Sequence, residues 1–296
     1  MKKKVGLVLG GGGAKGAYQI GVYKALKEFG LVDEIEAISG TSIGALNLAL
    51  LSLKEVEKAE DIWVNLSKRK VLTLKKWNEY FNFKNFSLLS RKGMLEIFSS
   101  DIDFKRVSNC QIPLYVCATN EDDNIGESFK LNGCDEQRII DIISASSAIP
   151  TIFPSVKIDG KTYSDGYVYR NVPISTLEEY EHCNFLYVVP LSTNGAPKEG
   201  DYPDITIIDF NERQFFDLNI LEGTLNFDKE VAEQRIALGY NNAVRLLTFL
   251  RKKGVICITK KEKFFHFLGR FNGKNKRLKK YYSLADIDPL VVRKEV

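Results

Sequence analysis

Short apolar runs alternate with longer segments of helical periodicity along the chain. Runs rich in strand-forming residues predict strands near residues 4–9, 35–38, 113–118, 184–190 and 204–209. Helical spacing of apolar residues predicts helices near residues 15–29, 43–53, 135–147 and 226–250. The last helix has the clearest apolar stripe, which is formed by Ile236, Tyr240, Ala243, Leu247 and Leu250. Strands that alternate with helices predict an α/β fold with a mostly parallel, helix-covered sheet.

Composition narrows the class of protein. The chain has 296 residues, a length at which α/β proteins often form a single domain, and no repeat or low-complexity linker divides it. No stretch approaches about 18 consecutive apolar residues, so we expect no transmembrane helix. The five cysteines lack CxxC pairs and metal-ligand spacing, which disfavours a disulfide framework or a zinc site. The basic start at residues 1–4 precedes too short an apolar run for a secretion signal, so we expect a cytoplasmic protein.

The net charge of +4 is unevenly distributed. Residues 67–92 carry eight Lys or Arg and one acid, and residues 251–280 carry twelve and one. Both segments also contain aromatics, namely Trp77, Tyr80, Phe81, Phe83, Phe86, Phe264, Phe265, Phe267 and Phe271. Cations with interleaved aromatics fit peripheral association with an anionic membrane. Nucleic acid would attract the same cations, and a solvated cationic face over an aromatic core would give the same pattern.

A glycine-rich stretch follows the first predicted strand and precedes the first predicted helix. Residues 11–16 satisfy the G-x-G-x-x-G pattern of a dinucleotide-binding loop. Three acids lie near the spacing expected of a ribose-binding carboxylate: Asp33, Glu34 and Glu36. The P-loop pattern fails, because Lys15 is followed by Gly16. The same glycines could instead offer backbone N–H groups to an oxyanion, so the motif alone leaves both uses open.

A second motif follows the second predicted strand. Gly40-Thr41-Ser42-Ile43-Gly44 has the G-x-S-x-G pattern and leads into the apolar helix predicted over residues 43–53. Between a strand and a helix, the flanking glycines permit a tight turn that presents Ser42 at the carboxyl edge of the sheet. Ser42 is therefore a candidate nucleophile. Its alternative use is to cap the following helix.

A nucleophilic serine needs a base and oxyanion donors. The chain has two histidines, His182 before a predicted strand and His266 in the second basic segment, and no motif surrounds either. Asp165 is a better local candidate, because it precedes Gly166 on a turn after the hairpin predicted over residues 156–163. An Asp-Gly pair is also common in ordinary turns.

Four ordered blocks resemble the patatin-like phospholipases, a family of lipid acyl hydrolases with a Ser–Asp dyad. The blocks are an oxyanion block at residues 11–16, a nucleophile elbow at 40–44, the segment before the acid at 145–154, and an acid block at 165–173. In the acid block the matching residues are Asp165, Gly166, Asn171 and Pro173. Two positions depart from the family pattern: Tyr167 stands where Gly or Ala is usual, and Ser155 where a second Pro is common.

The resemblance implies roles for individual residues. Ser42 would attack an acyl carbonyl, and Asp165 would accept its proton. Backbone N–H groups of Gly11, Gly12 and Gly13 would stabilise the oxyanion. The implied substrate is a phospholipid or another carboxylic ester, and the implied reaction needs no cofactor and no metal.

The resemblance also implies a three-layer α/β/α sandwich with a mostly parallel central sheet. We expect an acyl hydrolase domain over residues 1–250, with residues 67–110 as a candidate cap, and a basic appendage over 251–296. Peripheral contact with an anionic membrane is expected, and nucleic acid is not. Two other classes stay open: a nucleotide-binding α/β protein that uses the glycine loop, and a non-catalytic membrane-binding module that uses the basic segments.

Overall fold

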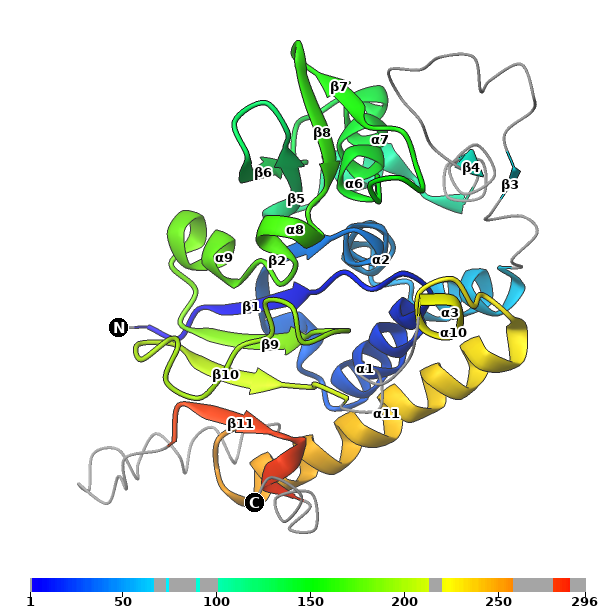
Figure 1. Cartoon of the computed structure of the whole chain (residues 1–296). Helices are drawn as coiled ribbons and strands as arrows, with labels where there is room; N and C mark the ends of the chain where they lie inside the picture. The colour runs from blue at the N-terminus through cyan, green and yellow to red at the C-terminus, as the bar shows by residue number, and fades with distance from the viewer. Residues whose placement is uncertain are drawn as a thin grey trace, which may run out of the picture.

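The computed structural model describes residues 2–66, 101–212, 220–257 and 279–287, together with the short strands β3 (Thr73–Leu74) and β4 (Leu89–Ser90). At its centre is a nine-stranded sheet of order β11-β10-β9-β1-β2-β5-β8-β7, in which β6 also pairs with β5 (Figure 1). Its strands are β1 (Val5–Leu9), β2 (Ile35–Thr41), β5 (Leu114–Asn120), β6 (Ile125–Lys130), β7 (Val156–Ile158), β8 (Lys161–Asp165), β9 (Phe185–Val189), β10 (Thr206–Asp209) and β11 (Tyr281–Ser283). The run from β11 to β5 is parallel, whereas β6, β7 and β8 are antiparallel to their neighbours.

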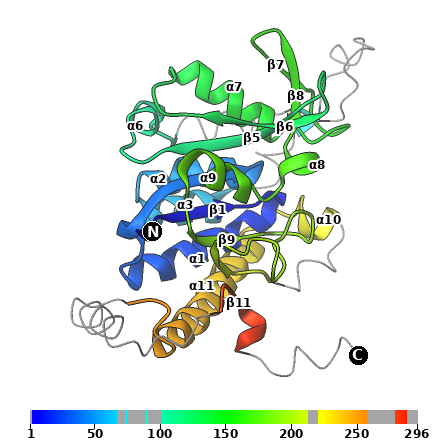
Figure 2. The ribbon, with the colours of Figure 1, turned by 90° about the vertical axis from the view of Figure 1, so that its left-hand side faces the viewer.

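Helices cover both faces of the sheet. Those that share the larger core are α1 (Ala17–Glu28), α2 (Ile43–Ser52), α3 (Val56–Asn65), α6 (Phe104–Ser108), α7 (Glu136–Ser146) and α11 (Lys229–Lys252). α9 (Ile174–Glu181) packs in a smaller core with the other face. Because strand side chains alternate, Leu7 and Leu9 enter the larger core and Val8 enters the smaller one. The fold is thus the predicted α/β/α sandwich (Figure 2).

Every strand and helix predicted from the pattern corresponds to an observed element. The helix predicted near 15–29 begins as a 3₁₀ turn at Gly13–Gly16 before α1, and the long terminal helix is shifted slightly, to 229–252. Several elements were not predicted, among them β6, α3, α9 and β11. In β6 the side chains are half-buried or exposed along the whole strand, so its sequence lacks the period-two alternation that marks a strand.

Parts of the sequence-based domain division fall outside the described residues. These parts include most of the candidate cap at 67–110 and most of the basic segment at 251–280. Within 251–296, the stretch Tyr281–Ser283 forms β11, which pairs in parallel with β10 at the edge of the sheet. The segment expected as an appendage therefore contributes a strand to the sheet, and the boundary after residue 250 stays a prediction. Within the described ranges, no helix combines the length and the apolar character needed to cross a bilayer.

The long helices α1 and α11 cross in backbone contact (Figures 1 and 2). A Cβ atom built on Gly21 would collide with the carbonyl oxygen of Ile236 and would lie 2.7 Å from the backbone nitrogen of Tyr240. On α11, a Cβ on Gly239 would collide in the same way with the carbonyl oxygen of Tyr18. Backbone atoms cannot rotate away as side chains can, so the spacing of the two helices depends on these glycines.

We expect Gly21→Ala to lower the free energy of unfolding by about 1–3 kcal/mol, because the added methyl group overpacks the helix crossing. Alanine's better helix propensity offsets only part of this loss. Urea denaturation measures the change. Asn241→Ala, at an exposed position of α11, is the matched control and should change stability little. Equal stability of Gly21→Ala and the control would show that the helices are not in the close contact described.

Candidate active site

Ser42 lies in the turn between β2 and α2, with φ 56° and ψ −123°. A positive φ is strained for a residue other than glycine, and such strain is concentrated at functional sites. The turn is tight, since a Cβ on Gly40 would collide with the carbonyl oxygen of Gly44, and one on Gly44 with that of Leu9. The Ser42 side chain makes no capping hydrogen bond to α2. The two glycines of the motif are therefore required by backbone contacts, and the serine hydroxyl is available for another partner.

The sheet topology brings that partner to Ser42. β6 occupies one edge of β5, so the other edge is shared by β2, which pairs with it up to Cys117, and β8, which pairs with it from Ala118 onward. β2 is parallel to β5 and β8 is antiparallel, so their carboxyl ends face each other. Thr41, at the end of β2, and Asp165, at the end of β8, thus lie opposite consecutive residues of β5.

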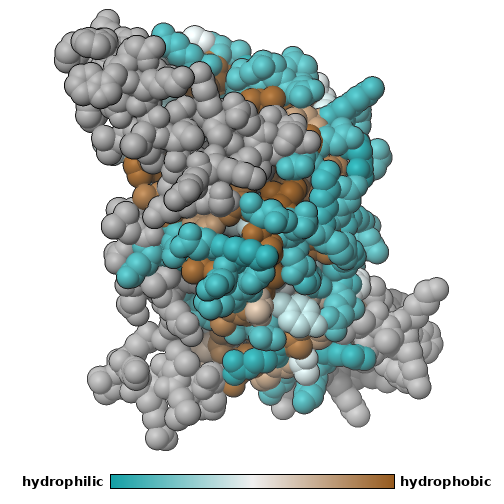
Figure 3. Space-filling view, turned by 90° about the vertical axis from the view of Figure 1, so that its right-hand side faces the viewer, coloured by the Kyte–Doolittle hydropathy of each residue, from teal (hydrophilic) through white to brown (hydrophobic). Residues whose placement is uncertain are grey.

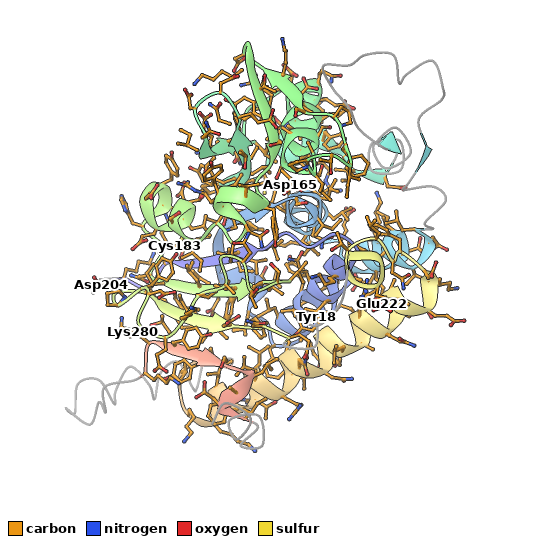
Figure 4. The ribbon with its side chains drawn as sticks, viewed as in Figure 1. Tyr18, Asp165, Cys183, Asp204, Glu222 and Lys280 are labelled. Carbon is orange, nitrogen blue, oxygen red and sulfur yellow. The ribbon has the colours of Figure 1, made fainter. Side chains whose placement is uncertain are left out.

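The hydroxyl of Ser42 donates a hydrogen bond to Asp165 Oδ2 at 2.6 Å. The other carboxylate oxygen, Oδ1, accepts the backbone N–H of Tyr167 at 2.8 Å. Both side chains are buried, with 5% of Ser42 and 1% of Asp165 exposed. Figure 4 shows Asp165, the last residue of β8, near α2. The Tyr167 contact uses a backbone N–H, which any non-proline residue offers, so tyrosine fits where the family pattern has a small residue.

Ser146 supports the elbow from the segment before the acid. Its Oγ accepts the backbone N–H of Ser42 at 2.8 Å and donates to the carbonyl oxygen of Cys117 at 2.6 Å. Ala148 on the same segment accepts the backbone N–H of Asp165 at 2.9 Å. The block at residues 145–154 therefore positions both members of the pair, a role that the sequence alone did not reveal.

The glycine loop passes beside Ser42. A Cβ built on Gly11 would lie 3.1 Å from the Cβ of Ser42. The N–H of Gly11 donates to the carbonyl oxygen of Asn171 at 3.2 Å. Within the described residues, the N–H groups of Gly12 and Gly13 have no hydrogen-bond partner. Of the three glycines predicted as oxyanion donors, these two thus have an N–H that no described group engages.

Three buried side chains hold the glycine loop at both ends. Gln19 Nε2 donates to the carbonyl oxygen of Gly10 at 2.8 Å, and Asn47 Nδ2 donates to that of Gly16 at 2.9 Å. Asn47 Nδ2 also donates to Gln19 Oε1 at 2.8 Å, and Trp63 Nε1 donates to Asn47 Oδ1 at 2.8 Å. The roles of these three residues were not predicted from the sequence. The available signal was an amide side chain within an otherwise apolar helix, since Asn47 lies in the predicted helix 43–53.

Ser42 lines a small cleft of about 30 Å³. Its lining is mainly apolar and includes Ile43, Leu46, Ile149, Phe153, Leu225 and Phe227, with Gly13, Ser147 and Thr224. On the face shown in Figure 3, hydrophobic residues are visible between hydrophilic ones. The segment 224–227 was not predicted to belong to the site. The cleft therefore presents an apolar surface next to the serine hydroxyl.

Two buried cations lie in or near the glycine loop: Lys15 belongs to the loop, and Arg235 comes from α11. Burial, and secondarily the charge of Arg235, lower the pKa of Lys15 to about 8. Burial also lowers the pKa of Arg235 to about 10, and its guanidinium donates to the carbonyl oxygens of Glu222 at 2.7 Å and Asn226 at 3.1 Å. Neither cation pairs with a carboxylate among the described residues. A positive charge on these side chains would favour a negative charge that develops at the loop.

The geometry does not support a dinucleotide site at the glycines. Asp33 and Glu34 precede β2 and Glu36 is its second residue, so all three are at the amino edge of the sheet. The glycine loop is at the carboxyl edge, where a ribose-binding acid would also have to be. His182 follows α9 and precedes β9, which places it at the amino edge as well, away from Ser42. His266 lies outside the described residues, and within them no group of three or more His, Cys, Asp or Glu could hold a metal ion.

Comparison with known proteins identifies the family of the chain. Residues 7–177, more than half of the chain, match the family model of the patatin-like phospholipases. Lysophospholipase nte1 of Aspergillus terreus is 62% identical over 48 residues, and neuropathy target esterase sws of Drosophila persimilis is 56% identical over 46. Each match covers 16% of this chain and 3% of the relative, so the chain spans a small part of these proteins. The crystal structure of VipD from Legionella pneumophila aligns with a TM-score of 0.47 and 14% identity, over 84% of this chain and 67% of VipD. The family match includes the glycine loop, the serine elbow and Asp165, and it shows that the chain belongs to the patatin-like phospholipase family.

Proposed function

We propose that this protein is a lipid acyl hydrolase that cleaves carboxylic esters of phospholipids or lysophospholipids. The observation that carries the proposal is the 2.6 Å hydrogen bond from Ser42 Oγ to Asp165 Oδ2 in a strained elbow beneath an apolar cleft. Membership of the family supports hydrolysis of lipid, and the names of the relatives support a lysophospholipid as one substrate.

In the proposed reaction, Ser42 Oγ attacks the ester carbonyl carbon while its proton moves to Asp165 Oδ2. The tetrahedral intermediate collapses as the ester C–O bond breaks, and Asp165 returns the proton to the leaving alcohol. A water molecule then attacks the acyl-enzyme, again giving its proton to Asp165. The fatty acid leaves, and the serine hydroxyl is restored.

The environment of Asp165 suits this role. The Tyr167 N–H engages Oδ1, which leaves Oδ2 directed at the serine. A carboxylate is a weak base toward an alcohol, so stabilisation of the oxyanion must supply much of the rate enhancement. We assign that stabilisation to the N–H groups of Gly12 and Gly13, because the Gly11 N–H is already used by Asn171.

The remaining parts of the proposal concern the substrate and the membrane. The acyl chain would lie in the cleft lined by Ile43, Leu46, Phe153 and Phe227. The basic segments at 67–92 and 251–280 would attract an anionic membrane, a prediction from sequence that lies mostly outside the described residues. We retain a cytoplasmic location with peripheral membrane contact as part of this proposal.

Ser42→Ala should abolish ester hydrolysis, with a loss of about 10⁴-fold or more, because no acyl-enzyme can form. The loss is measured as the rate of hydrolysis of a short-chain soluble ester and of lysophosphatidylcholine. Ser155→Ala is the matched control, since this hydroxyl bonds Glu121 and does not contact the pair. Substantial hydrolysis by Ser42→Ala would show that another group is the nucleophile.

Asp165→Asn should lower kcat by about 10²–10⁴-fold while keeping the fold, because an amide preserves shape but cannot accept the proton. The double variant His182→Gln with His266→Gln should retain most of its turnover. Thermal unfolding of each variant verifies that the fold is intact. If the histidine-free protein is folded but inactive while Asp165→Asn is active, the base is a histidine and the proposed dyad is wrong.

Lys15 gives a prediction about pH. The ammonium is charged below its pKa of about 8, so its favourable effect on the oxyanion should be present at neutral pH and lost as the pH rises through 8. We expect kcat to fall on the alkaline side of about pH 8. In Lys15→Met, kcat at pH 7 should be lower by about tenfold, and the alkaline fall should disappear. An unchanged kcat–pH profile in Lys15→Met would exclude this electrostatic role.

A further inference from the structure

Trp63, on α3, contacts both the glycine loop and a residue that lines the cleft. The side chain is buried, and its indole Nε1 donates to Asn47 Oδ1 at 2.8 Å. Asn47 Nδ2 in turn donates to the carbonyl oxygen of Gly16 at 2.9 Å. The indole also packs on the loop itself, since a Cβ built on Gly16 would lie 2.9 Å from Trp63 Cζ2. The same ring stacks on Phe227, with 6.2 Å between centroids and 17° between planes, and Phe227 lines the cleft.

A second contact joins the cleft to the glycine loop. Residues 224–227, which we call the cleft wall, supply three of the residues that line the cleft. The N–H of Ala14, on the glycine loop, donates to the carbonyl oxygen of Thr224 at 2.8 Å. The cleft wall therefore joins the loop directly at its first residue, and through Trp63 at its last residue, Phe227. Because of these two attachments, we expect a displacement of the cleft wall to move the loop.

The size of the cleft determines which substrates act on the cleft wall. Its volume of about 30 Å³ has room for about two water molecules. A short acyl group fits beside Ser42 with little change, whereas a long acyl chain must displace side chains that line the cleft. Binding energy from a part of the substrate remote from the reacting carbonyl raises kcat when it improves the positioning of groups that stabilise the transition state.

We propose that Trp63 is a positioning residue that connects a long acyl chain in the cleft to the oxyanion donors, so that kcat increases with the length of the acyl chain. The inference rests on the proposed function, since it concerns ester hydrolysis at Ser42. A chain that presses on Phe227 braces Trp63 against Gly16. It thereby fixes the loop whose N–H groups would stabilise the oxyanion. Trp63 itself touches neither the ester nor the serine in this proposal.

The test is hydrolysis of the p-nitrophenyl esters of butyrate and decanoate, with kcat and KM measured separately. In the unmodified chain, kcat should be at least about tenfold higher for decanoate than for butyrate. Trp63→Phe removes the indole N–H, and Phe227→Leu removes the stacked ring but keeps an apolar side chain. In both variants the ratio of the two kcat values should fall to about one, while KM stays lower for decanoate. A general loss of stability would instead lower the activity on both esters equally.

Phe153→Leu is the matched control, because it makes the same change at a residue that lines the cleft from the segment before the acid. It should raise KM for decanoate and keep the ratio of kcat values. Thermal unfolding verifies the fold of each variant. Loss of the ratio in Phe153→Leu as well would show that burial of the chain alone sets kcat, which would overturn the role of Trp63.

Fluorescence tests the connection without a change at Trp63. The sequence contains one other tryptophan, Trp77, so Trp77→Phe leaves a single indole. Modification of Ser42 by a fluorophosphonate with a decyl chain should shift the emission of Trp63, because the chain reaches Phe227. Modification by the methyl analogue should not. This measurement and Phe227→Leu keep the test decisive if Trp63→Phe does not fold.

The outcomes separate this proposal from the proposed function. Identical emission of the two adducts would overturn the role of Trp63. So would a ratio of kcat values that is about one in the unmodified chain, or one that Trp63→Phe and Phe227→Leu leave unchanged. In each of these cases ester hydrolysis at Ser42 would stand. A folded, unmodified chain that hydrolyses neither ester would reject the enzymatic function itself.

Discussion

The candidate site depends on one topological constraint: β2 and β8 share a single edge of β5. Because β6 occupies the other edge of β5, the two strands must meet end to end. Their carboxyl ends carry Ser42 and Asp165, and the hydrogen bond between them is a consequence of that meeting. The supporting contacts follow the same constraint, since Ser146 bridges the Ser42 N–H and the carbonyl oxygen of Cys117 where the two strands converge.

The arrangement also explains how a two-residue pair could work without a histidine. Asp165 is held by the Tyr167 N–H and by backbone contacts on both sides, so little reorganisation is needed when it takes a proton. The glycine loop is fixed at both ends by amide side chains in the core, Gln19 and Asn47. Preorganised donors of this kind stabilise developing charge more effectively than mobile water does.

Much of this could be predicted from the sequence, for reasons that are local. Apolar runs fixed the positions of the parallel strands, and the serine motif lay where a strand leads into a helix. The pairing of Ser42 with Asp165 was expected only from the family resemblance, and the other contacts between segments distant in the chain could not be predicted. Gly11 was predicted from the sequence to be an oxyanion donor. Only the fold shows that its N–H donates to the carbonyl oxygen of Asn171, 160 residues later in the chain. β6 was missed because its side chains are half-buried or exposed along the whole strand. Asn47 was missed because a polar residue in an apolar helix does not identify its partners.

The central claim is that Ser42 is the activated nucleophile of the folded chain. The most direct test is to treat the unmodified protein with a fluorophosphonate and map the adduct by peptide mass spectrometry. This account predicts one adduct per chain, on the peptide that contains Ser42, and its absence from the denatured protein. An adduct on another residue, or no adduct in the folded protein, would contradict the account.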